Sequence, residues 1–377
     1  MKLVVERNNF LKVLQKIQTI IEKKSTMPVL SHTLIETKDG KLDVLATDLE
    51  LSFKGSCEAK IQTPGQIVVP ARALYNIIRS LKEERVELEE DENGWLKITA
   101  GKSRFSLVSM PVEEFPVFPD IETINTVSVP PELFRKGLMK TYFSIAKEDV
   151  NPTYAGLCLE KIKDSEPKLR FVSTDTFRLT YMEIPFPELE ELQFESKIMV
   201  PRKAVIEMLK LSDSEKLFVG FDNQAGVIKT ENALLYVRLM ENKFPQYQSL
   251  IPEKCEYKAI INKDELKDIL KRIIVIMTEK TKVADFIFSS NCLSIKAENT
   301  SIGTAEEEVE IEFVKEDGDK DELKMIFNIS LLLDILNALE SEVFSFGLNT
   351  ERLPCVITGE KDIGFKSLIA PVIEKEI

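Results

Sequence analysis

The sequence predicts an α+β protein made of three tandem copies of one domain, each with two helices packed on antiparallel sheets. A short strand, a capping residue and an amphipathic helix occur three times, in residues 4–17, 127–140 and 259–272. Each helix carries two apolar residues four positions apart, so it presents an apolar face to a sheet. These pairs are Phe10 and Leu14, Phe134 and Leu138, and Leu266 and Leu270.

A second unit also occurs three times: an apolar strand that runs straight into a helix, in residues 67–81, 198–211 and 325–339. Pro70, Pro201 and Asn328 stand near the helix starts, where first-turn prolines and capping residues are common. The remaining segments alternate apolar and polar residues, as half-buried strands do.

Turn signals recur in the same register. The stretches "ATDLELSF", "STDTFRLTY" and "ENTSIGTAEEEV" each place an acidic or amide residue in a turn before an alternating strand. Proline-rich connectors follow the first two copies. We therefore expect three domains, at residues 1–121, 122–250 and 251–377.

Composition excludes several classes of protein. No stretch of the 377 residues reaches the roughly 18 to 20 apolar residues that span a bilayer. The first residues carry charges and lack the pattern of a signal peptide, so we expect a cytoplasmic protein. The five cysteines are scattered and His32 is the single histidine, which predicts reduced thiols, no metal site and no cofactor.

No catalytic constellation stands out. The sequence has no Walker loop and no G-x-G-x-x-G motif, and one histidine leaves little room for a Ser-His-Asp triad. Its many carboxylates occur in runs typical of solvated strands and loops. The sequence therefore favours a protein that is not an enzyme.

Positive charge is concentrated in the helices, although the chain has a net charge of −13. Five of the six predicted helices hold more Lys and Arg than Asp and Glu. One interpretation is that these residues are good helix formers on solvated faces. The other is that the helices share one basic surface that contacts DNA phosphates without reading sequence. The predicted helices span 8–24, 71–82, 131–147, 201–210, 263–282 and 329–340.

Several motifs, in collinear order along the whole chain, resemble the DNA polymerase III beta subunit family, the bacterial sliding clamps. They are "VVPARALYNIIRSL", "SRFSLVSMP", "STDTFRL", "MVPRKAVIEML", "KFPQYQSLIP" and "FNISLLLDILNAL". The resemblance implies a processivity subunit that forms a ring as a head-to-tail homodimer. Helices would line the hole around duplex DNA, and no cofactor would be needed.

The resemblance also implies a pocket for short linear peptides from the replicative polymerase alpha subunit, the clamp loader, and other polymerases and repair proteins. The alternative is that Phe177 and Leu179 are core residues of a half-buried strand. The family often has Gly where this chain has Thr176, a basic residue at Ser249, and Met-Pro-Met-Arg at 370–373. The implied pocket residues are Tyr154, Thr174, Thr176, Phe177, Arg178, Leu179, Pro245, Ser249, Leu250, Leu353, Cys355, Ala370, Pro371, Val372 and Ile373.

Two further sets of residues follow from the resemblance. The expected seam between subunits pairs Phe105 and Leu107 of one copy with Val275 and Ile276 of the other. The expected DNA contacts are Lys24, Arg72, Arg79, Lys147, Lys197, Arg202 and Lys203.

A repeat scaffold that binds proteins but no DNA remains a competing hypothesis, against which the helix charges argue.

Overall fold

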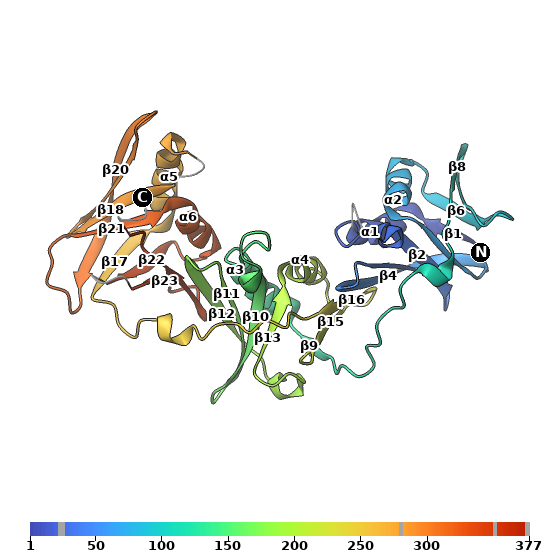
Figure 1. Cartoon of the computed structure of the whole chain (residues 1–377), viewed down its shortest axis with the longest axis horizontal. Helices are drawn as coiled ribbons and strands as arrows, with labels where there is room; N and C mark the ends of the chain where they lie inside the picture. The colour runs from blue at the N-terminus through green and yellow to red at the C-terminus, as the bar shows by residue number, and fades with distance from the viewer. Residues whose placement is uncertain (22–26, 279–281, 350–352, 374–377) are drawn as a thin grey trace. The chain divides into compact units, whose positions relative to one another are not determined.

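The computed structural model describes residues 1–21, 27–278, 282–349 and 353–373 (Figure 1). The chain divides into two compact units, each built around one twelve-stranded sheet. The first unit comprises Met1–Glu132, Glu190–Glu195 and Ile206–Leu239. The second comprises Leu133–Leu189, Ser196–Val205 and Met240–Ile377.

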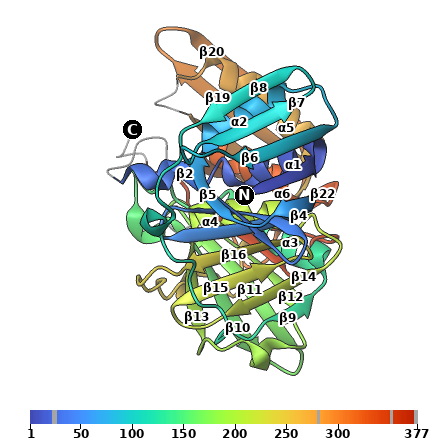
Figure 2. The same cartoon turned by 90° about the vertical axis from the view of Figure 1, so that its right-hand side faces the viewer.

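The first unit combines its sheet with helices α1 (Arg7–Ile17) and α2 (Ala71–Ser80), which contact each other. Figure 2 shows β4, β16 and β15 side by side. The strand order is β8 (Ser103–Leu107), β7 (Leu96–Ala100), β6 (Arg85–Glu90), β1 (Lys2–Glu6), β4 (Leu51–Thr63), β16 (Ala233–Arg238), β15 (Ala225–Lys229), β14 (Leu217–Phe221) and β9 (Val127–Val129), with β2 (His32–Lys38), β3 (Lys41–Thr47) and β5 (Gln66–Pro70) off this path.

The second unit has α5 (Lys263–Ile273) packed against α6 (Ile329–Ala338). Helices α3 (Pro131–Tyr142) and α4 (Arg202–Leu211) each have residues in both units. The strand order is β13 (Lys197–Pro201), β10 (Gly156–Lys163), β11 (Pro167–Thr174), β12 (Arg178–Pro185), β24 (Phe365–Ile369), β23 (Cys355–Gly359), β22 (Val343–Leu348), β17 (Tyr257–Asn262), β20 (Gly303–Lys315), β19 (Cys292–Asn299), β18 (Val283–Ser289) and β21 (Leu323–Asn328).

Each sheet runs on from one predicted repeat into the next. Strand β4 of the first repeat pairs with β16 of the second, and β12 of the second pairs with β24 of the third. The two compact units therefore divide the middle repeat between them, because backbone hydrogen bonds cross both repeat junctions. The domain ranges deduced from the sequence stay a prediction.

Equivalent turns in the first and second repeats have the same backbone conformation. Asp48 Oδ1 accepts the N–H groups of the second and third residues that follow it, at 3.0 and 2.6 Å. Asp175 Oδ1 makes the same two bonds at 3.1 and 3.0 Å. Leu49 and Thr176, the residues directly after these aspartates, both have a positive φ, of 74° and 79°.

The predicted helix faces are confirmed. All six apolar residues of the three predicted pairs have no exposed surface. The Asn328 side chain caps α6 by accepting the N–H groups of Ser330 and Leu331 at 3.0 and 3.3 Å, as its position in the sequence predicted.

Three helices end five or more residues earlier than predicted, and α2 and α6 end two residues earlier, at Ser80 and Ala338. Helices α1, α3 and α5 end at Ile17, Tyr142 and Ile273, not at residues 24, 147 and 282. Beyond α5 the chain forms a short 3-10 helix, η6 (Ile274–Ile276), made of β-branched residues whose side chains disfavour the α-helix. Of the six α-helices within the described residues, five still hold more Lys and Arg than Asp and Glu, and the only charged residue of α6 is Asp334.

A buried ion pair joins α3 to the turn between β23 and β24. Lys140 Nζ lies 2.6 Å from Asp362 Oδ1 and 2.5 Å from the Ala338 carbonyl, and the two side chains are 7% and 0% exposed. Burial alone raises the pKa of the Asp362 carboxyl, but hydrogen bonds from the Glu340 N–H, Lys140 and Ser341 outweigh it and lower this pKa to about 2.

We expect Asp362→Asn to lower the free energy of unfolding at pH 7 by about 2–3 kcal/mol, because it leaves the buried Lys140 with only the half-exposed Glu340 carboxylate, at 3.2 Å, as a counter-ion. An unfolded aspartate has a pKa near 3.9, above the folded value. The stabilisation is therefore fully present above about pH 4–5 and disappears as the pH falls toward 2. Urea unfolding of wild type and Asp362→Asn at pH 7 and pH 2.5 should show a difference in the free energy of unfolding that is smaller at pH 2.5.

Glu342→Gln, which breaks only the exposed Lys361 pair, is the control. A difference between wild type and Asp362→Asn that does not depend on pH would contradict this assignment.

Candidate functional site

Three neighbouring strands of the second sheet end side by side, and apolar residues gather at these strand ends. We call this end of the three strands the edge of the sheet. Arg178, the first residue of β12, pairs with Ile369, the last residue of β24, and Ile369 pairs with Cys355, the first residue of β23. The residues just beyond these ends therefore lie together. The Ala370 N–H donates to the Phe177 carbonyl at 2.9 Å.

Large apolar side chains are exposed at this edge. Phe177 is 64% exposed, Leu250 51% and Leu353 45%. Leu179 is 4% exposed and Cys355 is fully buried. The core interpretation is thus right for Leu179 and wrong for Phe177. We call Phe177, Leu250 and Leu353, with residues 370–373, the Phe177 surface.

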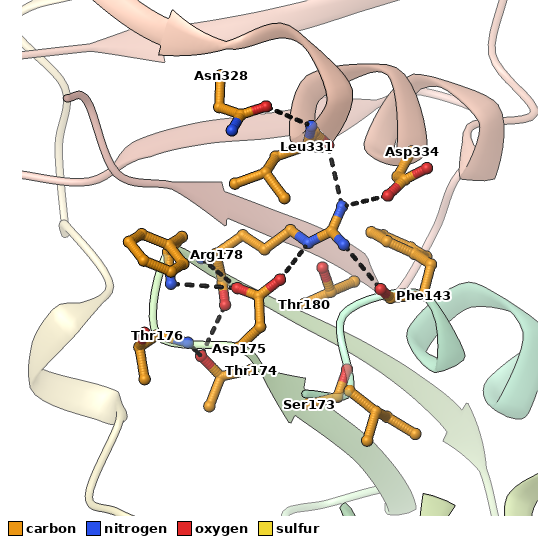
Figure 3. Close-up of polar contacts among 12 residues, drawn as sticks. Phe143, Ser173, Thr174, Asp175, Thr176, Arg178, Thr180, Asn328, Leu331 and Asp334 are labelled. Carbon is orange, nitrogen blue, oxygen red and sulfur yellow. Dashed lines mark hydrogen bonds and ion pairs between the residues drawn. The ribbon is translucent and has the colours of Figure 1, made fainter. Parts of the chain in front are cut away.

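Arg178 anchors the turn that presents Phe177 (Figure 3). Its Nε lies 2.9 Å from Asp175 Oδ2, and its Nη1 lies 2.9 Å from Asp334 Oδ2 of α6. The guanidinium also donates to the carbonyls of Leu331 at 3.1 Å and Phe143 at 2.8 Å. Arg178 is only 7% exposed. It therefore supports the surface from beneath.

The turn itself is closed by short polar side chains. Thr174 Oγ1 donates to the Arg178 carbonyl at 2.6 Å and accepts the Thr176 N–H at 3.1 Å. Thr176 is exposed and adopts φ 79°, a region that a β-branched residue enters only with strain. The turn thus holds Phe177 outward at a cost in backbone energy.

The segment 244–251 supplies the neighbouring wall. Phe244 and Tyr247 belong to the core cluster that contains Leu179 and Leu368, and Ile251 packs against it. This places Leu250, in the 3-10 helix η5 (Gln248–Leu250), beside the buried floor that Leu179 helps to form. Pro245 is half-buried and Ser249 is exposed.

A polar network fixes this segment. The Tyr247 hydroxyl donates to Glu160 Oε2 and accepts from Arg170 Nη1 at 2.9 Å, and Gln248 Nε2 donates to Glu160 Oε1 at 3.1 Å. Burial and the hydrogen bond to Glu160 raise the pKa of Tyr247 above its usual value. Nothing in the sequence spacing pairs Tyr247 with Glu160, so this contact was missed.

The remaining predicted pocket residues lie around this edge. Tyr154, at the end of the 3-10 helix η3 (Pro152–Tyr154), is half-buried, as are Pro371 and Ile373. The Val372 N–H donates to the Ile326 carbonyl at 2.8 Å, which ties the end of the described chain to β21. The Cys355 thiol lies 3.9 Å from the Met325 sulfur.

The residues expected to contact DNA have different surroundings. Arg72, Arg79 and Lys147 are exposed, whereas Arg202 and Lys203 are half-buried at the start of α4. The Arg202 guanidinium lies 4.5 Å from the centre of the Tyr142 ring. Lys24 lies outside the described residues.

Lys197 faces away from α3. Its Nζ lies 3.0 Å from Glu160 and 5.2 Å from the centre of the Tyr247 ring. Phe171 points to the other face of this sheet, where its ring contacts Phe134 of α3. This placement favours a role for Lys197 in anchoring Tyr247 over a role in DNA contact.

The residues expected at the seam are accessible within their own units. In the first unit, Phe105 is 38% exposed and Leu107 is half-buried, on the edge strand β8. In the second unit, Val275 is 75% exposed and Ile276 is half-buried, both in η6.

The cysteines and acidic residues offer no metal centre within the described ranges, where no three His, Cys, Asp or Glu side chains group suitably. All five cysteines are free, and burial raises the pKa of Cys57 and Cys158 to about 12, so these two thiols stay protonated. No helix in the described part of the chain is long and apolar enough to cross a bilayer.

The fold places the chain in the class of DNA sliding clamps. The Caulobacter crescentus beta sliding clamp superposes with a TM-score of 0.92 at 28% identity and covers 99% of both chains. A Bartonella birtlesii sliding clamp solved with bound griselimycin has a TM-score of 0.91 at 26% identity, covering 99% of this chain and 100% of that one.

Sequence comparison agrees with this class. The beta sliding clamp of Chlamydia pneumoniae is 29% identical over 359 residues, which is 95% of each chain. The profiles of the DNA polymerase III beta subunit match residues 1–119 for its N-terminal domain, 128–246 for its central domain and 248–373 for its C-terminal domain. The chain therefore belongs to the DNA polymerase III beta subunit family, the sliding clamps, which are processivity subunits and not themselves enzymes.

We expect Thr176→Gly to raise the free energy of unfolding by about 1 kcal/mol, because glycine adopts a positive φ without strain. Thr176→Ala is the matched control, since it keeps the Cβ atom and therefore most of the strain. Urea denaturation of the three proteins checks this. Equal stabilisation by both substitutions would show that the backbone strain is not the cause.

Proposed function

We propose that two copies of this chain close head to tail into a ring around duplex DNA, and that the Phe177 surface tethers partner proteins by short linear peptides. The partners would be the replicative polymerase alpha subunit, the clamp loader, and other polymerases and repair proteins. The observation that carries the proposal is an exposed Phe177 on a turn fixed by a buried arginine. An apolar group held rigid in solvent is typical of a binding site.

The chemistry of the Phe177 surface suits a peptide with apolar anchors. Phe177, Leu250 and Leu353 offer apolar area, while the Thr176 and Ser249 side chains are exposed beside them. Burying one Leu or Phe anchor contributes about 1.5–3 kcal/mol, which corresponds to roughly ten- to a hundredfold in affinity.

We expect Phe177→Ala to weaken binding of a peptide from the C-terminus of the polymerase alpha subunit at least tenfold, with stability unchanged because the side chain is exposed. Fluorescence anisotropy measures the affinity. Leu179→Glu is a poor test here, because it would place a charge in the core. Phe218→Ala, at a 36% exposed phenylalanine of β14, is the matched control. Equal peptide affinity in all three proteins would remove the Phe177 surface as the docking site.

The charge of the helices supports passage of DNA through the ring. We propose Arg72, Arg79, Lys147, Arg202 and Lys203 as phosphate contacts, with Lys24 outside the described residues, and we regard Lys197 as a weaker candidate. Few unspecific contacts permit sliding, and the acidic remainder of the chain disfavours wrapping.

Retention on DNA should depend on topology. After a clamp loader has placed the protein on nicked circular DNA, we expect it to persist at moderate salt and to leave within minutes of linearisation, because a ring slides off free ends. Gel filtration of the complex before and after cleavage measures this. Equal retention on circular and linear DNA would indicate ordinary site binding, and no retention on either would favour the protein scaffold.

The ring requires a homodimer, for which β8 and η6 offer the proposed surfaces. We expect a mass of about twice 43.0 kDa in sedimentation equilibrium. Phe105→Arg should shift the protein toward monomer, because it would bury an unpaired charge at the seam. Val117→Arg, at a 93% exposed position, should leave the dimer intact. A wild-type monomer at micromolar concentration would be incompatible with the ring.

We further propose the three domain ranges 1–121, 122–250 and 251–377, and a cytoplasmic location where the replication machinery operates. The three matched profile ranges support the first proposal. Reduced thiols suit the second, since the five cysteines form no disulfide.

A further inference from the structure

A solvent-open hollow of about 490 Å³ lies on the second sheet, and none of the Phe177 surface residues is among those that line it. Its floor consists of Lys258, Ser345, Gly347, Val356, Thr358 and Lys366, from strands β17, β22, β23 and β24. Segment 252–255 and the turn at Glu316 and Asp317 form its walls. We call this hollow the lysine basin. Its volume is that of a ligand-binding cleft.

Strand register places the two floor lysines on opposite sides of the basin. Lys258 pairs with Gly347, and Gly347 with Val356. Thr358 pairs with Ser345, and the β23–β24 ladder, in which Ile357 faces Ser367, continues to Lys366 opposite Thr358. Lys258 and Lys366 are therefore three strand spacings apart across the sheet, roughly 14 Å, and two residues, roughly 7 Å, apart along it, which makes about 16 Å in all.

Small side chains keep the floor open between the lysines. A Cβ atom added to Gly347 would meet the Cys255 sulfur at 2.6 Å, so the wall segment rests directly on this glycine. Serine and threonine at the other central positions present hydroxyl groups. In the part of the chain that the structure describes, neither Ser345 nor Thr358 has a side-chain hydrogen bond.

The two floor lysines place positive charge at a partly shielded position. Lys258 and Lys366 are both half-buried, and neither forms an ion pair with any described residue. The walls also carry charges, which are exposed, so solvent and salt screen them. They belong to Lys254, Glu253, Glu316 and Asp317. The floor thus presents two ammonium groups and two hydroxyl donors, which suit anionic oxygen atoms.

We propose that the lysine basin binds the carboxylates of an acidic segment that flanks the apolar anchor of a partner peptide. This inference rests on the proposed docking function of the Phe177 surface. The two sites adjoin, because Lys366 lies three residues from Ile369, the partner of Arg178, which is about 10 Å along a strand.

The separation of the lysines favours a peptide over a compact anion. In an extended chain, every second side chain points the same way, about 7 Å apart, so residues i and i+4 span about 14 Å. Two carboxylates at that spacing lie within reach of the long, flexible side chains of Lys258 and Lys366, whose backbone positions are about 16 Å apart. A single phosphate group engages one lysine at a time unless both side chains bend toward it.

The test compares peptides that differ only in flanking charge. The probes are the fluorescein-labelled C-terminal peptide of the polymerase alpha subunit with four glutamates added at its N-terminus or its C-terminus, and the matching versions with four glutamines. Anisotropy at 50 mM NaCl should show one glutamate version binding wild type about three- to tenfold more tightly than its glutamine version. The gain should shrink as NaCl rises.

Substitution of the floor lysines should remove this gain. We expect the double variant Lys258→Gln and Lys366→Gln to bind the glutamate and glutamine versions equally, with the glutamine affinity unchanged. Lys361→Gln, which removes an exposed charge of the same unit, should keep the gain. Inorganic phosphate at 10 mM should lower it no more than the same ionic strength of NaCl.

Two results would overturn the inference while sparing the docking function: equal binding of glutamate and glutamine versions to wild type, or a gain that survives in the double variant. A specific loss of the gain in phosphate would show that a compact anion is the preferred ligand, and the acidic-peptide assignment would be wrong. Failure of every peptide to bind wild type would contradict both the docking function of the Phe177 surface and the role of the lysine basin.

Discussion

The pairing of β12 with β24 is the constraint on which the candidate site depends. It joins residues nearly two hundred positions apart, Arg178 and Ile369, and it aligns the ends of three strands. Phe177, Leu353 and residues 370–373 consequently share one sheet edge. The same pairing places Lys366 on the adjoining part of the sheet. The positions of the Phe177 surface and of the lysine basin therefore both depend on the register of β12 with β24.

Buried charge maintains this edge. Arg178 gives four hydrogen bonds to two carboxylates and two carbonyls, and these tie the turn to α6 and to the chain after α3. A fully partnered buried cation is costly to disturb, so the turn holds its shape although Thr176 is strained. On the other wall, Tyr247 is held in the same manner by Glu160 and Arg170. Rigid walls lower the entropy cost of binding a flexible peptide.

The same turn occurs in the first and second repeats with different side chains on it. The Asp48 turn and the Asp175 turn have the same backbone bonds and the same positive φ at the next residue. After that residue the sequences differ: Glu50 stands at the position of Phe177, and Ser52, bonded to Thr47, at that of Leu179. The backbone is thus shared, while an exposed aromatic over an apolar floor occurs at the second turn.

The sequence by itself determined the α+β class, the threefold repeat, the apolar helix faces and the turns, because all of these are local patterns of period 2 or 3.6. The family resemblance located the residues of the Phe177 surface. Only the tertiary structure decided that Phe177 is exposed while Leu179 is core, that Arg178 is buried beneath the turn, and that Lys197 is bound to Glu160. The sequence could not show these features or the lysine basin, because each depends on strand register and on contacts between distant residues, which no local spacing encodes.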